Sequence, residues 1–192
     1  MANFSKAIEV IINIEGGYVD DPDDRGGETF MGISRVANPR WKGWHIIDKY
    51  KDGRGLSSSL LDDAYLKTLA KQLYKKKYWD IFKGDSFASE GIAKEMLDIG
   101  VNMGRRSAIR FLQTSLNAVN TSSLPDLKVD GRIGRKSLAL LTEVMQKGLE
   151  SYIVLMLNIL QGRKYISIGV RKKTQRKFMK GWLKYRVHLS LK

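Results

Sequence analysis

The chain has 192 residues, of which 43% are hydrophobic, and a formal net charge of +14. This composition fits one globular domain, or a domain with an integrated subdomain, and excludes a disordered chain. The lack of cysteine excludes disulfides and thiol nucleophiles, and the two histidines, His45 and His188, are too few for a histidine-rich zinc site. We therefore expect neither a metal nor a cofactor.

The excess positive charge is concentrated at the C-terminal end. Residues 151–192 contain eleven basic and no acidic residues, whereas seven acidic residues fall within the first thirty positions. This asymmetry predicts an anionic partner (nucleic acid, a membrane surface or a cell-wall polymer), although a solvated basic helix face gives the same composition. Because the sequence shows neither a helix-turn-helix nor an RNA-binding motif, we expect no specific nucleic-acid partner.

The first segment predicts an amphipathic helix over residues 4–15, ended by two glycines. Glu15 lies eleven residues after Phe4, which places it about 20° from the apolar stripe of this helix. Burial and the negative end of the helix dipole both raise the pKa of such a carboxyl group. A glutamic acid that stays protonated suits a general acid acting on a glycosidic oxygen. The ordinary alternative is a helix-terminal carboxylate paired with a lysine.

Residues 18–34 predict a loop or a small β-hairpin, because Asp, Pro and Gly cluster there without helical periodicity. A hairpin folding back over the helix end brings Asp24 and Thr29 opposite Glu15, so that a substrate lies between an acid and a carboxylate. A glycine pair, Gly26 and Gly27, leaves room for a ligand to approach the backbone. Three other residues compete with Asp24, or serve only the turn: Asp20, Asp21 and Asp23.

The rest of the chain is predicted to be helical after an irregular, lid-like connection over 38–57. The helices are expected over 58–77, 88–101, 105–119, 135–146, 150–161 and 173–188. A turn-rich connector, T-S-S-L-P-D-L-K-V-D-G-R-I-G, precedes the helix over 135–146. The apolar run from Tyr152 to Leu160 is too short to span a bilayer, so we predict a buried helix and no transmembrane segment.

The residue inventory narrows the class of enzyme. The lack of cysteine excludes thiol-dependent peptidases and amidases, and scarce histidine disfavours zinc enzymes. Neither a G-x-S-x-G motif nor a phosphate-binding loop is present. Among enzymes that act on cell walls, a carboxylate-based glycosidase remains.

The stretch from Glu15 to Ile33 resembles glycoside hydrolase family 108, a family of lysozyme-like muramidases that includes phage endolysins and proteins described as secretion-activating. The family pattern is E-G-G-Y, then D-P-x-D-x-G-G-x-T, then G-I. The matching residues are Glu15, Gly16, Gly17, Tyr18, Asp21, Pro22, Asp24, Gly26, Gly27, Thr29, Gly32 and Ile33. The resemblance implies that Glu15 is the catalytic glutamate and that Tyr18 and Gly27, within the motif, contact substrate.

A weaker similarity links the same stretch to phage-type lysozymes, in which eight and then five residues separate a Glu, an Asp and a Thr. Here eight residues separate Glu15 from Asp24, but only four separate Asp24 from Thr29. The similarity implies that Asp24 orients or activates water, or stabilises the transition state, and that Thr29 helps to hold the water. The one-residue departure leaves both roles open.

The second half resembles the predicted peptidoglycan-binding region that accompanies family 108. The similar strings are D-I-G-V-N-M-G, which contains Asn102, then F-L-Q-T-S-L-N, V-D-G-R-I-G-R-K-S-L and the terminal K-F-M-K-G-W-L-K-Y-R. We expect Asn102 to contact substrate, and Tyr78 to stack on a sugar ring unless it belongs to the core. The alternative interpretation of Asp130 and Gly131 is an ordinary turn without a binding role.

Together these features predict a mainly α, α+β lysozyme-like fold, a helical bundle with a small β-hairpin beside the active-site helix. We divide it into a catalytic region, 1–95, and a helical peptidoglycan-binding region, 96–192, packed into the same globular unit. The expected reaction is hydrolysis of the β-1,4 bond between N-acetylmuramic acid and N-acetylglucosamine. A lytic transglycosylase and a non-catalytic wall-binding or secretion accessory protein are the alternatives.

The expected partners are bacterial peptidoglycan and anionic wall polymers, and the expected state is a monomer. The first residues lack the basic start and uninterrupted apolar run of a secretory signal, since Glu9 interrupts them. We therefore expect synthesis in the cytoplasm and delivery by a holin or a secretion apparatus, with action in the periplasm or the wall.

Overall fold

The computed structural model describes residues 1–20, 27–52, 58–187 and 189, and the side chains of these residues except 13–15, 52, 58 and 59. The chain folds as two compact units. One unit, residues 5–77, contains most of the first helix, the sheet and two further helices. The other, residues 1–4 with 78–192, is a helical bundle. The first will be called the sheet unit and the second the helical unit.

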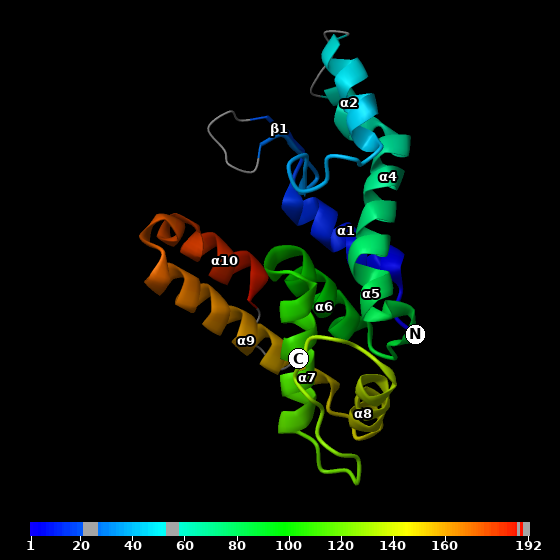
Figure 1. Cartoon of the computed structure of the whole chain (residues 1–192), viewed down its shortest axis with the longest axis vertical. Helices are drawn as coiled ribbons and strands as arrows, with labels where there is room; N and C mark the ends of the chain where they lie inside the picture. Colours follow the sequence, from blue (N-terminus) through cyan, green and yellow to red (C-terminus); the bar gives the residue numbers. More distant parts are fainter. Residues whose placement is uncertain (21–26, 53–57, 188, 190–192) are drawn as a thin grey trace. The chain divides into compact units, whose positions relative to one another are not determined.

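The predicted first helix is confirmed as α1, Phe4–Glu15 (Figure 1). Its inner face is buried through Ala7, Ile8, Ile11 and Ile12. Gly16 ends the helix with φ of +79°, a left-handed conformation that glycine adopts without a steric penalty. The helix therefore ends directly at Glu15.

The predicted hairpin is confirmed and gains a third strand. The strands are β1, Tyr18–Val19, β2, Thr29–Phe30, and β3, Ile33–Ser34, paired antiparallel in that order. The residues between β2 and β3, Met31 and Gly32, both have positive φ, which is typical of a two-residue hairpin turn. The hydroxyl of Tyr74 donates to the carbonyl of Met31 at 2.7 Å, which ties this turn to a helix of the same unit.

The prediction of an irregular connection over 38–57 is wrong where the chain forms the helix α2, Gly43–Asp52. This helix follows a tight aromatic cluster in which Trp41 and Trp44 pack edge to face at 5.0 Å. A methyl group at Gly43 would lie 2.3 Å from the Trp41 ring, so only glycine fits there. The Trp41 indole N–H donates to the carbonyl of Leu69 at 3.3 Å. Burial of these rings, which the local pattern did not reveal, fixes the segment as a helix.

The predicted helix over 58–77 is divided into α3, Ser58–Asp62, and α4, Ala64–Tyr74. Asp63 separates them, because its side chain accepts a hydrogen bond from the Leu66 N–H at 2.8 Å and caps the start of α4. A π-helical turn, η1, Lys75–Trp79, follows, and the division between the two units falls inside it.

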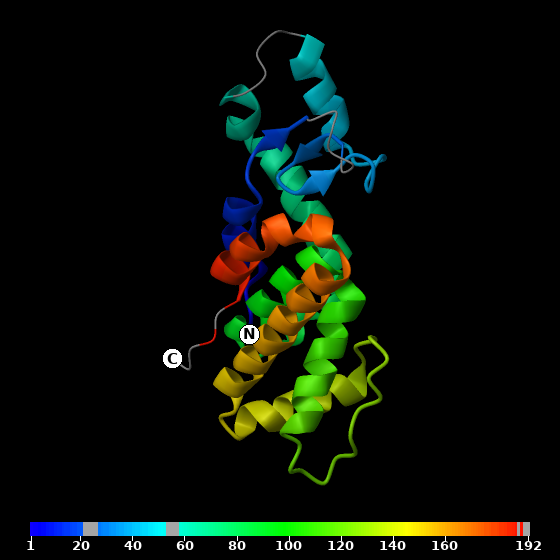
Figure 2. The ribbon, with the colours of Figure 1, turned by 90° about the vertical axis from the view of Figure 1, so that its left-hand side faces the viewer.

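The helical unit begins with α5, Asp80–Phe82, and the short 3-10 turn η2, Gly84–Ser86. Its main helices are α6, Glu90–Met103, α7, Arg105–Ala118, α8, Arg135–Gln146, and α9, Glu150–Arg171, followed by η3, Lys173–Phe178, and α10, Met179–Arg186. The helices α6, α7 and α9 pack against one another, and α10 folds back along α9 (Figures 1 and 2). The helices predicted over 88–101, 105–119 and 135–146 are confirmed, and α9 continues well beyond the predicted residue 161. The helix predicted over 173–188 is wrong for its first part, because Lys173–Phe178 forms the 3-10 helix η3 and the α-helix begins only at Met179.

The core of the helical unit is aromatic near its beginning. Phe4 packs edge to face on Trp79 at 5.5 Å, and the Trp79 indole N–H donates to Asp85 at 2.7 Å. The predicted burial of the run 152–160 is confirmed for Ile153 and Leu157 but wrong for Tyr152 and Ile159, which are about half exposed. Among the residues that the structure describes, no helix is long and apolar enough to cross a membrane.

Candidate active site

The sheet unit fixes the backbone of Glu15 beside the three-stranded sheet. Glu15 is the last residue of α1, and the carbonyl of Gly17 accepts a hydrogen bond from the Met31 N–H at 2.9 Å. In the same ladder, Val19 pairs with Thr29. The end of the helix is therefore joined to Met31, which directly follows β2, whereas Thr29, at the start of β2, pairs further along β1.

Two of the predicted site residues in this unit, Thr29 and Gly27, lie on β2 or next to it. The hydroxyl of Thr29 donates to the carbonyl of Gly27 at 3.1 Å, which leaves its oxygen lone pairs available to accept. Gly27 has φ of +61°, and a methyl group there would lie 3.2 Å from Cγ2 of Val36. Glycine at position 27 thus allows the left-handed backbone conformation and the close approach of Val36.

The remaining predictions at this site lie outside the described residues. They are the side chain of Glu15 and all of Asp21, Asp23, Asp24 and Gly26. The choice among the aspartates therefore stays a prediction.

A charged network joins the sheet to α2. We call it the hairpin network; it consists of Tyr18, Asp20, Glu28, Arg35, Asp48 and Lys51. Glu28 is at its centre and only 9% exposed, with ion pairs to Arg35 and, at 2.9 Å, to Lys51. Lys51 also pairs with Asp20 at 2.8 Å. One carboxylate thus holds two cations that come from separate parts of the chain.

Arg35 connects the network to α2. Its guanidinium makes two hydrogen bonds to Asp48, at 2.5 and 3.2 Å, and lies over the ring of Trp44 at 4.6 Å. Such bidentate pairing orients both side chains. The hydrogen bonds that Arg35 donates to Asp48, set against a smaller effect of burial, raise the pKa of Arg35. Arg35 therefore links the sheet to the helix as a permanent cation.

The predicted substrate contact Tyr18 is anchored by the same network. Its hydroxyl lies 2.9 Å from Oε1 of Glu28 and 3.2 Å from Oδ2 of Asp20. Burial, reinforced by Glu28 and opposed by Lys51, raises the pKa of Tyr18 to about 12. The phenol thus stays neutral and donates to a carboxylate, and any contact with a substrate would fall to its ring.

Asp20, one of the aspartates that compete with Asp24 for the second catalytic role, belongs to this network through its ion pair with Lys51. The hydrogen bond from Lys51 is the main reason that the pKa of Asp20 is lowered, so this carboxylate is ionised and paired. The pKa of Lys51 is raised in turn, because its bonds to Asp20, Tyr18 and Glu28 outweigh the effect of burial. A structural role accounts for Asp20.

The sequence reasoning missed four network residues, namely Glu28, Arg35, Asp48 and Lys51, of which Glu28 is the centre. It occupies the variable position of the G-G-x-T string, seven residues before Arg35 and twenty-three before Lys51. The pair with Arg35 forms across the β2–β3 hairpin, where the Arg35 N–H also donates to the Glu28 carbonyl at 2.8 Å. The pair with Lys51 forms only when the sheet and α2 come together, so local spacing carries no signal for it.

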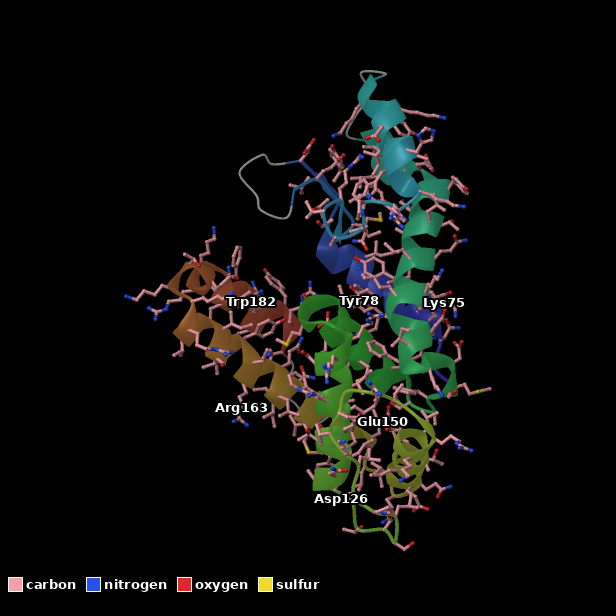
Figure 3. The ribbon with its side chains drawn as sticks, viewed as in Figure 1. Lys75, Tyr78, Asp126, Glu150, Arg163 and Trp182 are labelled. Carbon is pink, nitrogen blue, oxygen red and sulfur yellow. The ribbon has the colours of Figure 1, made fainter. Side chains whose placement is uncertain are left out.

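The other two predicted substrate contacts belong to the helical unit. Tyr78 lies in η1, half-buried, and a methyl group at Gly100 would lie 3.4 Å from its Cδ1 (Figure 3). Asn102 is near the end of α6, where its amide donates to the carbonyl of Asp98 at 2.9 Å. Asn102 lines a cavity of about 340 Å³ together with Met103, Lys164, Tyr165, Ile168, Gln175 and Trp182. Tyr78 is not part of that lining.

Asp130 and Gly131, in the connector before α8, form a turn that hydrogen bonds hold against α7. Asp130 accepts from the amide of Gln113 at 3.1 Å and from the Arg132 N–H at 2.8 Å, and these two bonds lower the pKa of Asp130. Gln113 in turn accepts from the Gly131 N–H at 2.9 Å, and Gly131 has φ of +76°. The geometry accounts for Asp130 and Gly131 as a turn held against α7.

Comparison with known proteins gives the class of this architecture. The family model "Glycosyl hydrolase 108" matches residues 8–104, and the model "Predicted Peptidoglycan domain" matches residues 107–187. Among solved structures, SagA of Brucella abortus is similar, with a TM-score of 0.66 and 28% identity over 94% of this chain and 87% of that one. A search of curated proteins gave no match.

The chain belongs to glycosyl hydrolase family 108, because the family model covers half of its length. The resemblance stated from the E-G-G-Y stretch is thereby confirmed, and so is the mainly α, lysozyme-like fold with a small antiparallel sheet. The two matched regions together define a peptidoglycan hydrolase with a peptidoglycan-binding region.

Proposed function

We propose that this hydrolase is a muramidase that cleaves the β-1,4 bond between N-acetylmuramic acid and N-acetylglucosamine, with Glu15 as its general acid. The observation that carries the proposal is the placement of Glu15 at the end of α1, where the ladder through Gly17 and Met31 holds it beside β2. The C-terminal end of a helix favours the neutral form of a carboxyl group. A neutral carboxyl group is the form that can donate a proton to the leaving oxygen.

In this mechanism Asp24 supplies the second carboxylate. Asp24 orients or activates water, or stabilises the oxocarbenium-like transition state. Thr29 helps to hold the water: its hydroxyl hydrogen is used by Gly27, so its oxygen accepts a hydrogen bond from the water. A separation of roughly 6.5–9.5 Å between the two carboxyl groups would give inversion, and roughly 5–5.5 Å would give retention.

The helical unit would hold the wall polymer. The cavity beside Asn102 combines two aromatic rings with amide and ammonium groups, since Tyr165, Trp182, Gln175 and Lys164 line it. Such a lining suits a sugar, whose apolar face stacks on a ring while its hydroxyl groups bond to the amides. Delivery to the wall would depend on a holin or a secretion apparatus, and the chain would act as a monomer.

The test is the chemistry of the products. Purified peptidoglycan is digested with the full chain, and the fragments are identified by mass spectrometry. A muramidase leaves a hydrated reducing end on N-acetylmuramic acid, whereas a lytic transglycosylase leaves the anhydro form. The matched variants are Glu15→Gln, expected to release no fragments, and Glu9→Gln, an exposed carboxylate of the same helix, expected to behave as wild type. Anhydro fragments alone would contradict the proposal.

A further inference from the structure

The outward face of α9 carries a row of exposed apolar side chains. Tyr152, Ile159, Ile166 and Val170 follow one another at intervals of seven, seven and four residues, so they lie along one stripe of the helix. Their exposed fractions are 49%, 49%, 55% and 70%. The opposite face is already packed, through Ile153 and Leu157. Exposed Arg163 lies on nearly the same side of the helix, between Ile159 and Ile166, so the row has one charged side chain within it. Exposed apolar side chains grouped on the surface of a bundle mark an interaction site.

At its C-terminal end the stripe opens into a groove between α9 and α10. The groove has a volume of about 420 Å³ and is lined by Ile166, Gly169, Val170, Arg176, Met179 and Leu183. A methyl group at Gly169 would lie 2.5 Å from Cε of Met179, so glycine lets Met179 pack onto the helix backbone. Nε of Arg176 donates to the Gly169 carbonyl at 3.0 Å, which leaves an almost wholly apolar floor.

The rim of this face is positively charged. Exposed basic side chains stand on both helices and on the turn between them: Arg163, Arg171, Lys173, Lys177, Lys180 and Lys184. Arg163 points away from the bundle (Figure 3). Residues 151–192 include no acidic residue to offset these charges. We call these basic side chains the basic border. Together with the apolar row, which contains Arg163, they form the surface that we call the α9–α10 face.

The combination of charge and apolar surface selects the partner. A second copy of the chain would bring two strongly basic faces together, which repel each other. Wall polymers and nucleic acids match the charge but offer no hydrocarbon to the groove. An anionic phospholipid bilayer offers both, since its phosphates pair with the basic border while its acyl chains cover the apolar row.

We propose that the α9–α10 face binds the surface of an anionic phospholipid membrane. The helix lies along the surface: the stripe from Tyr152 to Val170 spans about 27 Å at 1.5 Å per residue, and only its outer face enters the lipid. Binding is peripheral and reversible, and it would concentrate the chain at a membrane. This proposal does not depend on the muramidase assignment, because none of these residues belongs to the active site.

The experiment is flotation of the full chain with lipid vesicles. The wild type should float with vesicles of phosphatidylcholine and phosphatidylglycerol, remain unbound with phosphatidylcholine alone, and bind less as salt rises. The double variant Ile166→Asn with Val170→Asn should bind anionic vesicles at least about tenfold more weakly, because the apolar contact is lost. The control, Tyr65→Asn, removes a comparably exposed apolar side chain from α4 and should bind as wild type.

Two control measurements on the double variant, circular dichroism and binding to sacculi, make every remaining outcome of the flotation assay decisive. The double variant should keep the wild-type circular dichroism, and it should still bind isolated sacculi. Vesicle binding equal to wild type in the double variant, no vesicle binding by the wild type, or equal binding to neutral vesicles would each overturn the proposal. A wild-type dimer that becomes monomeric in the double variant would assign the face to a second copy instead.

Discussion

Glu95 is a carboxyl group buried in the helical unit, on the side of α6 that faces α9. Burial first, and then the nearby charge of Asp98, raises the pKa of Glu95 to about 8, while a hydrogen bond from Asn158 partly opposes this. Its Oε1 has no hydrogen-bond partner among the described residues. Asp98 is itself committed to Arg186 at 2.5 Å and to Gln161 at 3.1 Å.

The raised pKa makes the stability of the helical unit depend on pH. Between an unfolded pKa near 4.5 and the folded value of about 8, the unfolded chain has lost the proton that the folded chain retains. The free energy of unfolding therefore falls as pH rises through this window. Replacing Glu95 by Gln removes the titration, and we expect it to raise the free energy of unfolding by about 1–3 kcal/mol at pH 8 relative to wild type.

Urea denaturation at pH 5 and pH 8 checks this prediction. The two proteins should differ little at pH 5, where Glu95 is neutral in the fold. A wild type that gains stability between pH 5 and 8, while Glu95→Gln does not, would show that Glu95 is ionised and stabilising.

The second catalytic carboxylate is also a question at the scale of single residues. Asp24→Asn should lower the rate of wall lysis more than Asp20→Asn or Asp23→Asn, by about 10²-fold or more. The nine-residue offset from Glu15 favours Asp24, and the pairing of Asp20 with Lys51 gives Asp20 a structural task. Lysis assays on the three purified variants decide the matter, and a larger loss in Asp23→Asn would transfer the role to Asp23.

Among the elements, the sheet depends on the hairpin network for its attachment to α2. Glu28→Gln removes the charge that holds Arg35 and Lys51, and we expect it to lower the free energy of unfolding by about 1–3 kcal/mol. This loss of stability is smaller than that expected on breaking a fully buried ion pair, because both cations are about one third exposed. Lysis should weaken as well, since β2 carries Thr29.

The matched control is Asp48→Asn, which removes a carboxylate about half exposed at the edge of the same network. Asp48→Asn should lower the free energy of unfolding by less than about 1 kcal/mol, as measured by thermal denaturation. Equal costs for the two variants would show that burial of Glu28 does not govern the network.

The elements also show how far the sequence predicts the fold. The bounds of α1 and α8 follow from apolar periodicity and flanking glycines, and the hairpin follows from its Asp, Pro and Gly cluster. The break at Asp63 and the helix α2 were missed, because side-chain capping and burial of Trp41 and Trp44 fix them. The far end of α9 was missed because apolar residues there face outward as well as inward, which blurs the helical pattern.

The same limit applies to the candidate site. The motif locates Glu15, Thr29 and Gly27 on adjoining elements, since all lie within one short stretch. The ion pairs of Lys51 with Asp20 and Glu28 were not predictable, because Lys51 reaches the sheet from α2. On α10, Trp182 is half-buried and stacks on Tyr165 at 4.7 Å, whereas Tyr185 is exposed. Eight residues of amphipathic pattern do not specify which aromatic finds a partner.

At the scale of the whole molecule, the distribution of charge should govern attachment to the wall. Charge reversal at Lys173, Lys177 and Lys184, all exposed, should weaken binding to intact sacculi without unfolding the chain. The difference should shrink at high salt, because screening limits exposed charges to about 8 Å at ~0.15 M. Activity on short soluble muropeptides should be almost unchanged, since the triple variant leaves Glu15 intact.

Pull-down on sacculi at two salt concentrations measures this effect. Equal binding by the wild type and the triple variant at low salt would show that the basic segment serves another partner. Together with the flotation assay, the pull-down separates charge, which should matter for walls and membranes alike, from the apolar row of α9, which should matter for membranes alone.

The central claim is that Glu15 donates the proton that breaks the glycosidic bond, and the rate of wall lysis by Glu15→Gln tests it most directly. The amide keeps the size and shape of the side chain but cannot act as an acid. We predict a loss of more than about 10²-fold in the lysis rate with an unchanged circular dichroism spectrum. A folded Glu15→Gln variant that lyses purified walls at close to the wild-type rate would contradict the account.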